Sequence, residues 1–316
     1  MIRAEALAKA YGTKQAVDGI SFTVQPGKVT GFLGPNGAGK STTMRMIVGL
    51  DRPTAGTVTV NGRKYAEHAA PLREVGALLE AKSVHKSRSA RTHLRALAAT
   101  HAIPNRRVDE VIELTGLGAV AKKKVGGFSL GMGQRLGIAV ALLGDPQTLI
   151  LDEPVNGLDP EGVLWVRNLA RHLASQGKTV FISSHLMSEM ALTADHLIVI
   201  GRGRIIADAP IEQIIEGRSL PTSRVKTDHV ESLMNALAAE HVQLTRVDAE
   251  TVQVVGLDSR MIARRALDHQ ILLHELTPIQ QSLEDAYMSL TQNEVEYHSH
   301  LGNELAASAS GKQGLK

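Results

Sequence analysis

The chain of 316 residues contains no cysteine, which excludes disulfides and thiol chemistry and fits a cytosolic protein. No apolar run approaches the roughly 18 residues that a membrane span needs. Aromatic residues make up only 3% of the sequence, so aliphatic side chains must fill the core. Basic and acidic residues nearly balance at 35 against 32, and a net charge of +3 argues little for nucleic acid or anionic lipid.

The chain does contain a glycine-rich stretch, Gly34 to Ser41, that matches the phosphate-binding pattern G-x-x-x-x-G-K-[ST]. Residues 28–33 before it read as a buried strand, and residues 41–48 after it as a helix with one apolar face. Its glycines let successive N–H groups converge on one anion, beside the positive end of the helix. Lys40 is predicted to reach the β- and γ-phosphates, and the Ser41 hydroxyl to ligate Mg²⁺. The predicted nucleotide contacts in this stretch are Gly34, Pro35, Asn36, Gly37, Ala38, Gly39, Lys40, Ser41 and Thr42.

A carboxylate pair follows an apolar strand predicted at residues 148–151. Asp152 would lie at the carboxyl end of this strand beside the glycine-rich loop, where it can hold Mg²⁺ through water. Glu153, one residue on, can point at the attacking water, which predicts it as the general base. An Asp-Glu pair after a strand is commonplace alone, but downstream of a phosphate-binding loop it indicates nucleotide hydrolysis.

The order of the remaining elements predicts an α/β fold. Short apolar runs in residues 1–33 and 56–62 favour an antiparallel β-element. Residues 81–127 have helical character, and Asn105 is placed to cap one of these helices. Strands then alternate with helices as far as residue 216, which predicts a mainly parallel sheet covered on both faces.

After residue 217 the pattern restarts and predicts a small α+β domain. Its order, β-α-β-β-α-β, is that of a ferredoxin-like unit. The expected strands lie near 223–226, 242–247, 251–256 and 271–276, and the expected helices near 229–240 and 258–269. We expect this domain over residues 217–296, with a last helix near 279–296, and a disordered tail over residues 297–316 because that segment is rich in Ser, Ala and Gly.

The chain resembles the ATP-binding subunit of an ABC transporter over residues 1 to about 216. Residues 128–132, Phe-Ser-Leu-Gly-Met, are similar to the family's signature sequence L-S-G-G-Q: Ser129 and Gly131 match, and the other three depart. The resemblance implies a P-loop NTPase (RecA-like) core with an antiparallel β subdomain and a helical signature subdomain over about 81–147. In the family this loop completes the site on the opposite subunit. Two chains are therefore expected to sandwich two ATP, with Ser129 and Gly131 contacting the ATP of the partner.

Further residues are assigned singly from the resemblance. His185, after a strand, resembles the switch histidine that reaches the γ-phosphate, and Tyr11 resembles the aromatic residue that stacks on adenine. Without the resemblance, a lone histidine and a tyrosine in a turn would be read as structural. Residues 156–159 resemble the D-loop, which contacts the other subunit. Glu80 stands where the family usually has the Q-loop glutamine, and whether it touches Mg²⁺ or only couples the site to a partner stays open. The candidate Mg²⁺ ligands are Ser41, Asp152 and Glu80.

Residues 75–80 and the C-terminal domain ending in residues 282–287 resemble the ABC-2 branch, whose members often serve drug, antibiotic or peptide export. This implies an ATPase subunit that powers an exporter through ATP-driven dimerisation, with ATP and Mg²⁺ as cofactors. The implied partners are a second copy of the chain and a separate integral-membrane permease, with no nucleic acid. The implied location is cytoplasmic, peripheral on the inner face of the cell membrane.

Two other classes of function were weighed against transport. A soluble ABC ATPase acting on ribosomes would resemble two such units in tandem, whereas this chain has one phosphate-binding loop. One acting in DNA repair would carry a long coiled coil, and the sequence has no sustained heptads. A P-loop kinase or GTPase outside the family would lack a signature helix. Transport is therefore favoured, although the sequence does not identify the cargo, which is expected to pass through the permease.

Overall fold

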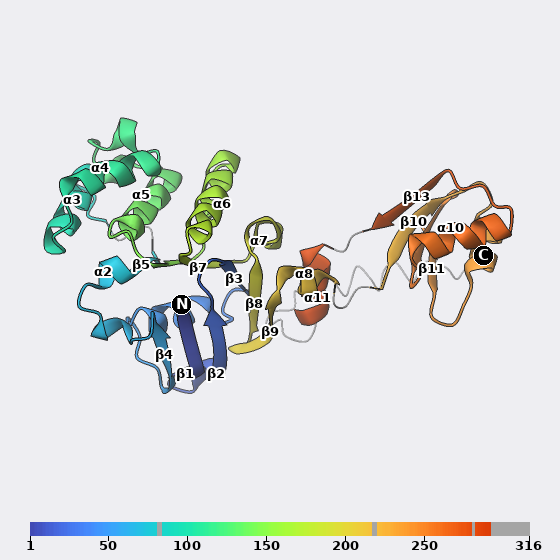
Figure 1. Cartoon of the computed structure of the whole chain (residues 1–316), viewed down its shortest axis with the longest axis horizontal. Helices are drawn as coiled ribbons and strands as arrows, with labels where there is room; N and C mark the ends of the chain where they lie inside the picture. The colour runs from blue at the N-terminus through green and yellow to red at the C-terminus, as the bar shows by residue number, and fades with distance from the viewer. Residues whose placement is uncertain (81–83, 217–219, 280–281, 292–316) are drawn as a thin grey trace, which may run out of the picture. The chain divides into compact units, whose positions relative to one another are not determined.

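The structure, a computed structural model, describes residues 1–80, 84–216, 220–279 and 282–291. The chain divides into two compact units, one built from Met1–Ala209 and one from Pro210–Ser289 (Figure 1). The tail predicted over residues 297–316 lies outside the described residues, as does the end of the last predicted helix. Among the helices that the structure describes, none is both long and apolar enough to cross a membrane.

A six-stranded sheet forms the centre of the first unit, in the order β5-β6-β7-β3-β8-β9. Its strands are β3 (Val29–Leu33), β5 (Val75–Leu78), β6 (Thr148–Leu151), β7 (Thr179–Ser184), β8 (His196–Gly201) and β9 (Arg204–Pro210). The five from β5 to β8 pair in parallel, which confirms the predicted parallel sheet. Every residue of β3, β6 and β7 is buried, because these strands are covered on both faces. Since parallel strands end at the same edge, the loops after these three strands lie side by side.

Helices link these strands and position the loops. α6 (Pro160–Ser175) and α7 (Met187–Thr193) both pack against the strands of the parallel sheet, whereas α1 (Lys40–Ile47) packs against strands of the antiparallel one. A short helix, α2 (Pro71–Glu74), precedes β5. The Asp159 side chain caps α6 by accepting a hydrogen bond from the Gly162 N–H at 2.9 Å, which fixes where the helix begins.

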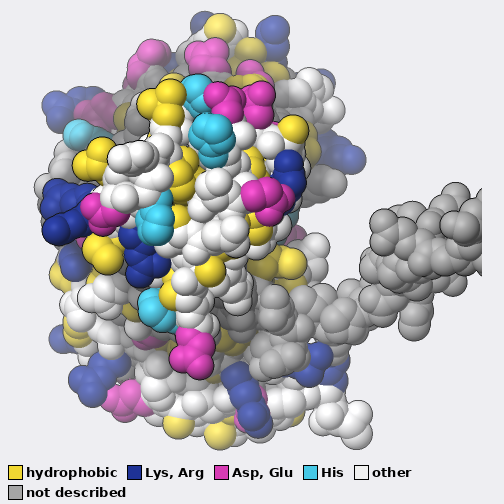
Figure 2. Space-filling view, turned by 90° about the vertical axis from the view of Figure 1, so that its right-hand side faces the viewer, with side chains coloured by type: hydrophobic (Ala, Val, Ile, Leu, Met, Phe, Trp, Pro, Cys, Tyr) yellow, Lys and Arg dark blue, Asp and Glu magenta, His cyan; other side chains and the backbone are white. Residues whose placement is uncertain are grey.

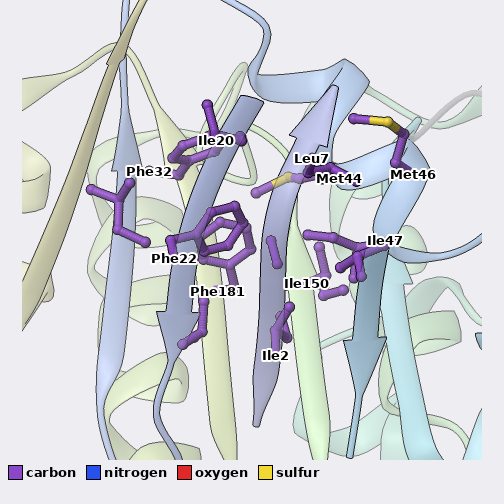
Figure 3. Close-up of a cluster of buried hydrophobic side chains, with 14 of the residues drawn as sticks. Ile2, Leu7, Ile20, Phe22, Phe32, Met44, Met46, Ile47, Ile150 and Phe181 are labelled. Carbon is purple, nitrogen blue, oxygen red and sulfur yellow. The ribbon is translucent and has the colours of Figure 1, made fainter. Parts of the chain in front are cut away.

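The antiparallel subdomain is a three-stranded sheet in the order β2-β1-β4, made of β1 (Ile2–Tyr11), β2 (Lys14–Val24) and β4 (Ala55–Val60). It shares a hydrophobic core with the parallel sheet (Figure 3). Phe22 lies 6.0 Å from Phe32 and 5.9 Å from Phe181, and the latter two lie 5.2 Å apart, measured between ring centroids. These three rings pack together where the two sheets meet, because a large ring reaches across both layers. Apart from these rings and Tyr287, the buried hydrophobic side chains of the described residues are aliphatic or methionine, as predicted.

The helical subdomain contains α3 (Ala90–Thr100), α4 (Asn105–Leu114) and α5 (Leu130–Leu142), with 3₁₀ turns at Gly118–Val120 and Val125–Gly127. Figure 1 shows these helices on the opposite side of the parallel strands from β1, β2 and β4. The prediction that Asn105 caps a helix is wrong. Asn105 is the first residue of α4, and Pro104 occupies the N-cap position in extended conformation. The fixed φ of proline is compatible with that conformation at the start of a helix.

The second unit confirms the small α+β fold. It contains α8 (Ile211–Glu216), β10 (Thr222–Lys226), α9 (Val230–Leu237), β11 (Gln243–Arg246), β12 (Thr251–Val255), α10 (Ser259–Asp268), β13 (Glu275–Ile279) and α11 (Leu283–Thr291). The last two residues of α11, Leu290 and Thr291, fall outside the Pro210–Ser289 unit. The antiparallel sheet has the order β11-β12-β10-β13, with α9 and α10 contributing to its core. The last strand begins at Glu275 rather than near 271, because Ile271 and Leu273 pack into the core from the connection before the strand. On the face drawn in Figure 2, acidic, basic, histidine and apolar side chains are interspersed.

Candidate functional site

The glycine-rich loop joins the carboxyl end of β3 to the start of α1. Gly37 and Gly39 have φ angles of 83° and 109°, a backbone region that residues with a Cβ rarely adopt. A Cβ at Gly34 would lie 2.4 Å from the carbonyl oxygen of Ile200, so only glycine fits there. The loop thus has the tight curvature that gathers backbone N–H groups around an anion, at the positive end of α1.

The Lys40 ammonium is folded back over this loop. The side chain is only 6% exposed, and Nζ donates hydrogen bonds to the carbonyl oxygens of Gly34 at 2.6 Å and Pro35 at 3.3 Å. Nζ also lies 3.6 Å from Oε1 of Glu153. A buried cation held at the mouth of an N–H-rich loop is a strong electrostatic site for a phosphate group.

A cavity of about 330 Å³ opens at the loop. It is lined by most of the loop between Pro35 and Thr42, by Tyr11 at the tip of the β1–β2 hairpin, and by Glu153. Gly34 and Ala38 are not among the lining residues, although both were predicted to contact nucleotide; Ala38 is buried beneath the loop. The tertiary structure therefore brings the Tyr11 ring, the side chains of two lysines, Lys14 and Lys40, and the Glu153 carboxylate together around a single cavity.

Asp152 and Glu153 follow β6 and are tied to the neighbouring strand β7 by one side chain. The Ser183 hydroxyl donates to Oδ1 of Asp152 and accepts from the backbone N–H of Glu153, the latter at 2.9 Å. Glu153 has a φ of 49°, in the left-handed region, which is unfavourable for a residue with a long side chain. This conformation, held by Ser183, turns the Glu153 carboxylate towards the cavity.

Three side chains meet at Glu153. Its Oε2 lies 2.8 Å from Nδ1 of His185, which follows β7, while its Oε1 faces Lys40. The buried Gln134 side chain, from α5 in the helical subdomain, donates through Nε2 to the Glu153 carbonyl oxygen at 3.1 Å. A carboxylate between an ammonium and an imidazole is well oriented, and the backbone beneath it is fastened to a helix of another subdomain.

Tyr11 lies at the edge of the cavity and is 49% exposed. Its hydroxyl donates to Oδ2 of Asp51 at 2.8 Å, and the Lys9 ammonium lies 5.0 Å from the ring centroid. Desolvation of the hydroxyl, followed by its hydrogen bond to the Asp51 carboxylate, raises the pKa of Tyr11 above its ordinary value. The ring is therefore neutral at physiological pH, with its hydroxyl anchored and much of its surface open.

The structure does not bring every predicted site residue to this cavity. Ser129 caps α5 by accepting from the Met132 N–H at 3.2 Å, and it lines a different cavity of about 520 Å³. Glu80 lines a third cavity, of about 420 Å³, where α1 and β5 adjoin the helical subdomain. Gly131, on α5, lines none of these three cavities. Within the described residues, no three Asp, Glu or His side chains converge on a point that could hold a metal.

Comparison with known proteins shows which family carries this arrangement. Residues 17–156 match the family described as ABC transporter, and residues 221–284 match a domain of unknown function. The chain is 42% identical over 217 residues to the bacitracin transport ATP-binding protein BcrA of Bacillus licheniformis, an alignment that covers 68% of this chain and 71% of the relative. The chain belongs to the ABC transporter ATP-binding proteins.

A second relative and a solved structure agree with this assignment. The ABC protein described here is 37% identical over 208 residues to the lantibiotic transport ATP-binding protein SrtF of Streptococcus pyogenes, which covers 66% of this chain and 90% of the relative. The solved structure of an ATP-binding subunit of an ABC transporter aligns with a TM-score of 0.63 at 25% identity, over 69% of this chain and 92% of that one. The predicted family and fold are confirmed. The chain is an ATP-binding ATPase of the transport branch, and the relatives do not favour action on ribosomes or DNA.

Sequence reasoning missed two residues that shape the site of this ABC ATPase. The sequence pattern assigns no role to Ser183, yet its hydroxyl holds both the Asp152 carboxylate and the Glu153 backbone N–H. Gln134 has no role predicted from the sequence, yet its side chain reaches the Glu153 backbone from 19 positions away in the chain. A polar residue at the carboxyl end of a buried strand, and a glutamine on the buried face of an apolar helix, were the available signals.

Proposed function

We propose that this chain powers the export of a peptide antibiotic or similar drug through a separate membrane permease, using ATP bound and hydrolysed at sites shared by two copies of the chain. The observation that carries the proposal is the contact of the Glu153 carboxylate with both Lys40 and His185 at the mouth of the phosphate-binding loop. The cargo class rests on the names of the two relatives, which are transport proteins for bacitracin and a lantibiotic.

The site residues would divide the work of hydrolysis. The loop N–H groups and Lys40 bind the phosphates, and His185 is within reach of a γ-phosphate because it already contacts Glu153. Glu153 takes a proton from the attacking water as general base. The available donors for a metal are the Ser41 hydroxyl, which lines the cavity, and the carboxylate of Asp152 beside it; such oxygen ligands suit Mg²⁺. When bound there, Mg²⁺ would neutralise charge on the phosphates. Glu80 lies in another cavity and is a weaker candidate ligand.

The dimer follows from the separation of the two phosphate-binding elements. Ser129 and Lys40 line cavities that share no lining residue, so one chain offers only half of each predicted site. Ser129 stands at the N-terminus of the 13-residue helix α5, where backbone N–H groups favour an anion. A second copy placed with its Ser129 and Gly131 over Lys40 would enclose the ATP between two positive helix ends.

A separate permease is proposed because the two relatives are named as the ATP-binding proteins of transport systems. The cavity of about 420 Å³ beside Glu80 is a candidate seat for it, since it joins the parallel-sheet core to the helical subdomain. Leu50 at this cavity is 60% exposed and would be available for contact with such a partner. Docking there would hold the chain at the inner face of the cell membrane.

A transport experiment tests the proposal as a whole. The chain is co-expressed with the membrane protein sought in the neighbouring reading frame, recognised by about six apolar runs of roughly 20 residues. Inside-out vesicles are then prepared. We expect ATP-dependent uptake of labelled bacitracin or a lantibiotic, and none when the chain carries Glu153→Gln. Uptake that continues without ATP, or with the variant, would contradict the proposal.

Replacing Tyr11 by Ala is expected to weaken ATP binding about tenfold, because stacking of an aromatic ring on a base contributes about 1–3 kcal/mol. Isothermal titration of wild type and variant with ATP measures the change. Phe128, which lines the Ser129 cavity instead, offers a control: Phe128→Ala should leave the affinity of the isolated chain for ATP unchanged. An unaltered dissociation constant for Tyr11→Ala would return Tyr11 to a role in packing the hairpin.

We further propose the domain division of 1–216 for ATP binding and 217–296 for an accessory domain that regulates or stabilises the dimer. Every residue of the ATP site lies upstream of position 210, where the compact C-terminal unit begins. A chain ending at Gly217 is therefore expected to bind ATP with the affinity of the full chain, measured by the same titration. A soluble, folded truncation that does not bind ATP would contradict this division.

A further inference from the structure

The Tyr11 hydroxyl is held by an ion pair at the far end of α1. Oδ2 of Asp51 accepts from this hydroxyl at 2.8 Å and also from Nε of Arg45 at 2.8 Å, while Nη2 of Arg45 donates to Oδ1 at 3.3 Å. Arg45 lies on α1, and Asp51 follows that helix; the Asp51 backbone N–H donates to the Arg45 carbonyl oxygen at 3.3 Å. The carboxylate is therefore fixed on two sides before it receives the tyrosine.

This contact relates the ring to the phosphate-binding loop. α1 begins with Lys40, Ser41 and Thr42, so the helix that carries Arg45 also sets the position of the phosphates. Tyr11 is the last residue of β1, which belongs to the antiparallel sheet rather than to the parallel sheet that carries the loop. It lies at the tip of a hairpin, where it pairs with Lys14. Without the bond to Asp51, a half-exposed ring at a hairpin tip would sample several rotamers. With it, the distance from ring to phosphate loop is set by one rigid helix.

We propose that Asp51, braced by Arg45, is a positioning residue that holds the Tyr11 ring in place for the adenine base. This rests on the proposed stacking of Tyr11 on adenine. Both Arg45 and Asp51 are intermediate in burial, so their ion pair is partly screened and contributes little to stability by itself. The ion pair instead restricts the rotamers of the Tyr11 ring, and so affects the part of the binding energy that comes from the base.

The test compares a ligand that has a base with one that lacks it. The full chain is titrated with ADP and with pyrophosphate in the presence of Mg²⁺, so that no hydrolysis occurs. Asp51→Ala and Tyr11→Phe are each expected to weaken ADP binding about two- to tenfold, the range for freeing one ordered side chain. Pyrophosphate affinity should not change. Asp51→Asn keeps an acceptor oxygen for the hydroxyl and should retain most of the ADP affinity.

A matched control and a double variant sharpen the test. Asp109→Ala removes a comparable ion pair, with Arg91 on the helical subdomain, and should leave both affinities unchanged. Because Tyr11→Phe and Asp51→Ala both remove the bond between the Tyr11 hydroxyl and Asp51, the double variant should lose less ADP affinity than the sum of the two single losses. Circular dichroism and thermal unfolding confirm that each variant is folded.

Three results would overturn the inference. The first is ADP affinity unaffected by both Asp51→Ala and Tyr11→Phe. The second is a parallel loss of ADP and pyrophosphate binding, which would mean that the phosphate loop itself was disturbed. The third is strict additivity in the double variant. If Tyr11→Ala weakens nucleotide binding and these variants do not, the proposed stacking stands and only the role of Asp51 fails; if Tyr11→Ala has no effect, both fail.

Discussion

Glu153→Gln is expected to lower the rate of ATP hydrolysis by roughly 10²–10⁴-fold, the usual contribution of a general base, while ATP still binds. Glutamine keeps the size of the side chain and can accept a hydrogen bond, but it cannot take a proton from water. The structure strengthens this expectation, since the Glu153 carboxylate is already held 3.6 Å from the Lys40 ammonium and 2.8 Å from His185. Turnover at saturating ATP and the dissociation constant for ATP measure the two effects separately.

The same variant should form a dimer that depends on bound ATP. If each ATP is shared between Lys40 of one chain and Ser129 of the other, unhydrolysed ATP holds the pair together. Glu153→Gln is expected to elute as a dimer in size-exclusion chromatography with ATP present, whereas the wild type with ATP and Mg²⁺ returns to monomer. Glu161→Gln, an exposed glutamate in the first turn of α6, is the control and should behave as wild type.

Each outcome of this experiment bears on a separate claim. Hydrolysis at the wild-type rate would show that Glu153 is not the base. A variant that hydrolyses slowly but stays monomeric with ATP bound would contradict the shared site for the isolated chain. In that case the permease would be needed to bring the two copies together, and the measurement would be repeated on the assembled transporter.

Lys40→Ala is expected to weaken ATP binding at least about 10²-fold and also to abolish hydrolysis of the ATP that does bind, because each hydrogen bond to a charged group contributes about 1.5–3 kcal/mol and the ammonium would contact two phosphates. The side chain is buried without belonging to the hydrophobic core, so the fold should survive. Nucleotide titration and turnover at saturating ATP measure the loss. Unchanged turnover would contradict the assignment of the phosphate-binding loop.

The structure adds a complication to this variant. Lys40 also donates to the Gly34 and Pro35 carbonyl oxygens, so its removal frees part of the loop. Lys40→Met keeps the apolar stem of the side chain and separates the loss of charge from the loss of packing. Both variants should lose ATP binding equally if charge dominates. Lys28→Ala, at an exposed lysine before β3, is the control.

Local patterns predicted most of the elements, and the errors have local causes. The strand predicted at 28–33 is observed as β3 and the helix at 41–48 as α1, within one residue at each end. Both have strong signals, a buried apolar run and a helical apolar face. The fourth strand of the C-terminal unit was misplaced because the apolar run from Ile271 packs in the core without joining the sheet. A short apolar run is expected both for a buried connection and for a paired strand, and only the tertiary contacts distinguish the two.

By itself the sequence determined the family and the fold class, because the phosphate-binding loop and the Asp152-Glu153 pair, which carry the predicted chemistry, are each contiguous in the chain. Only the tertiary structure decided how these residues are held. Ser183, Gln134 and Asp51 come from separate elements, and each acts through hydrogen bonds to residues far away in the chain. The sequence does not show which distant residue a polar side chain will contact, because the packing of sheets and helices determines which residues lie close together.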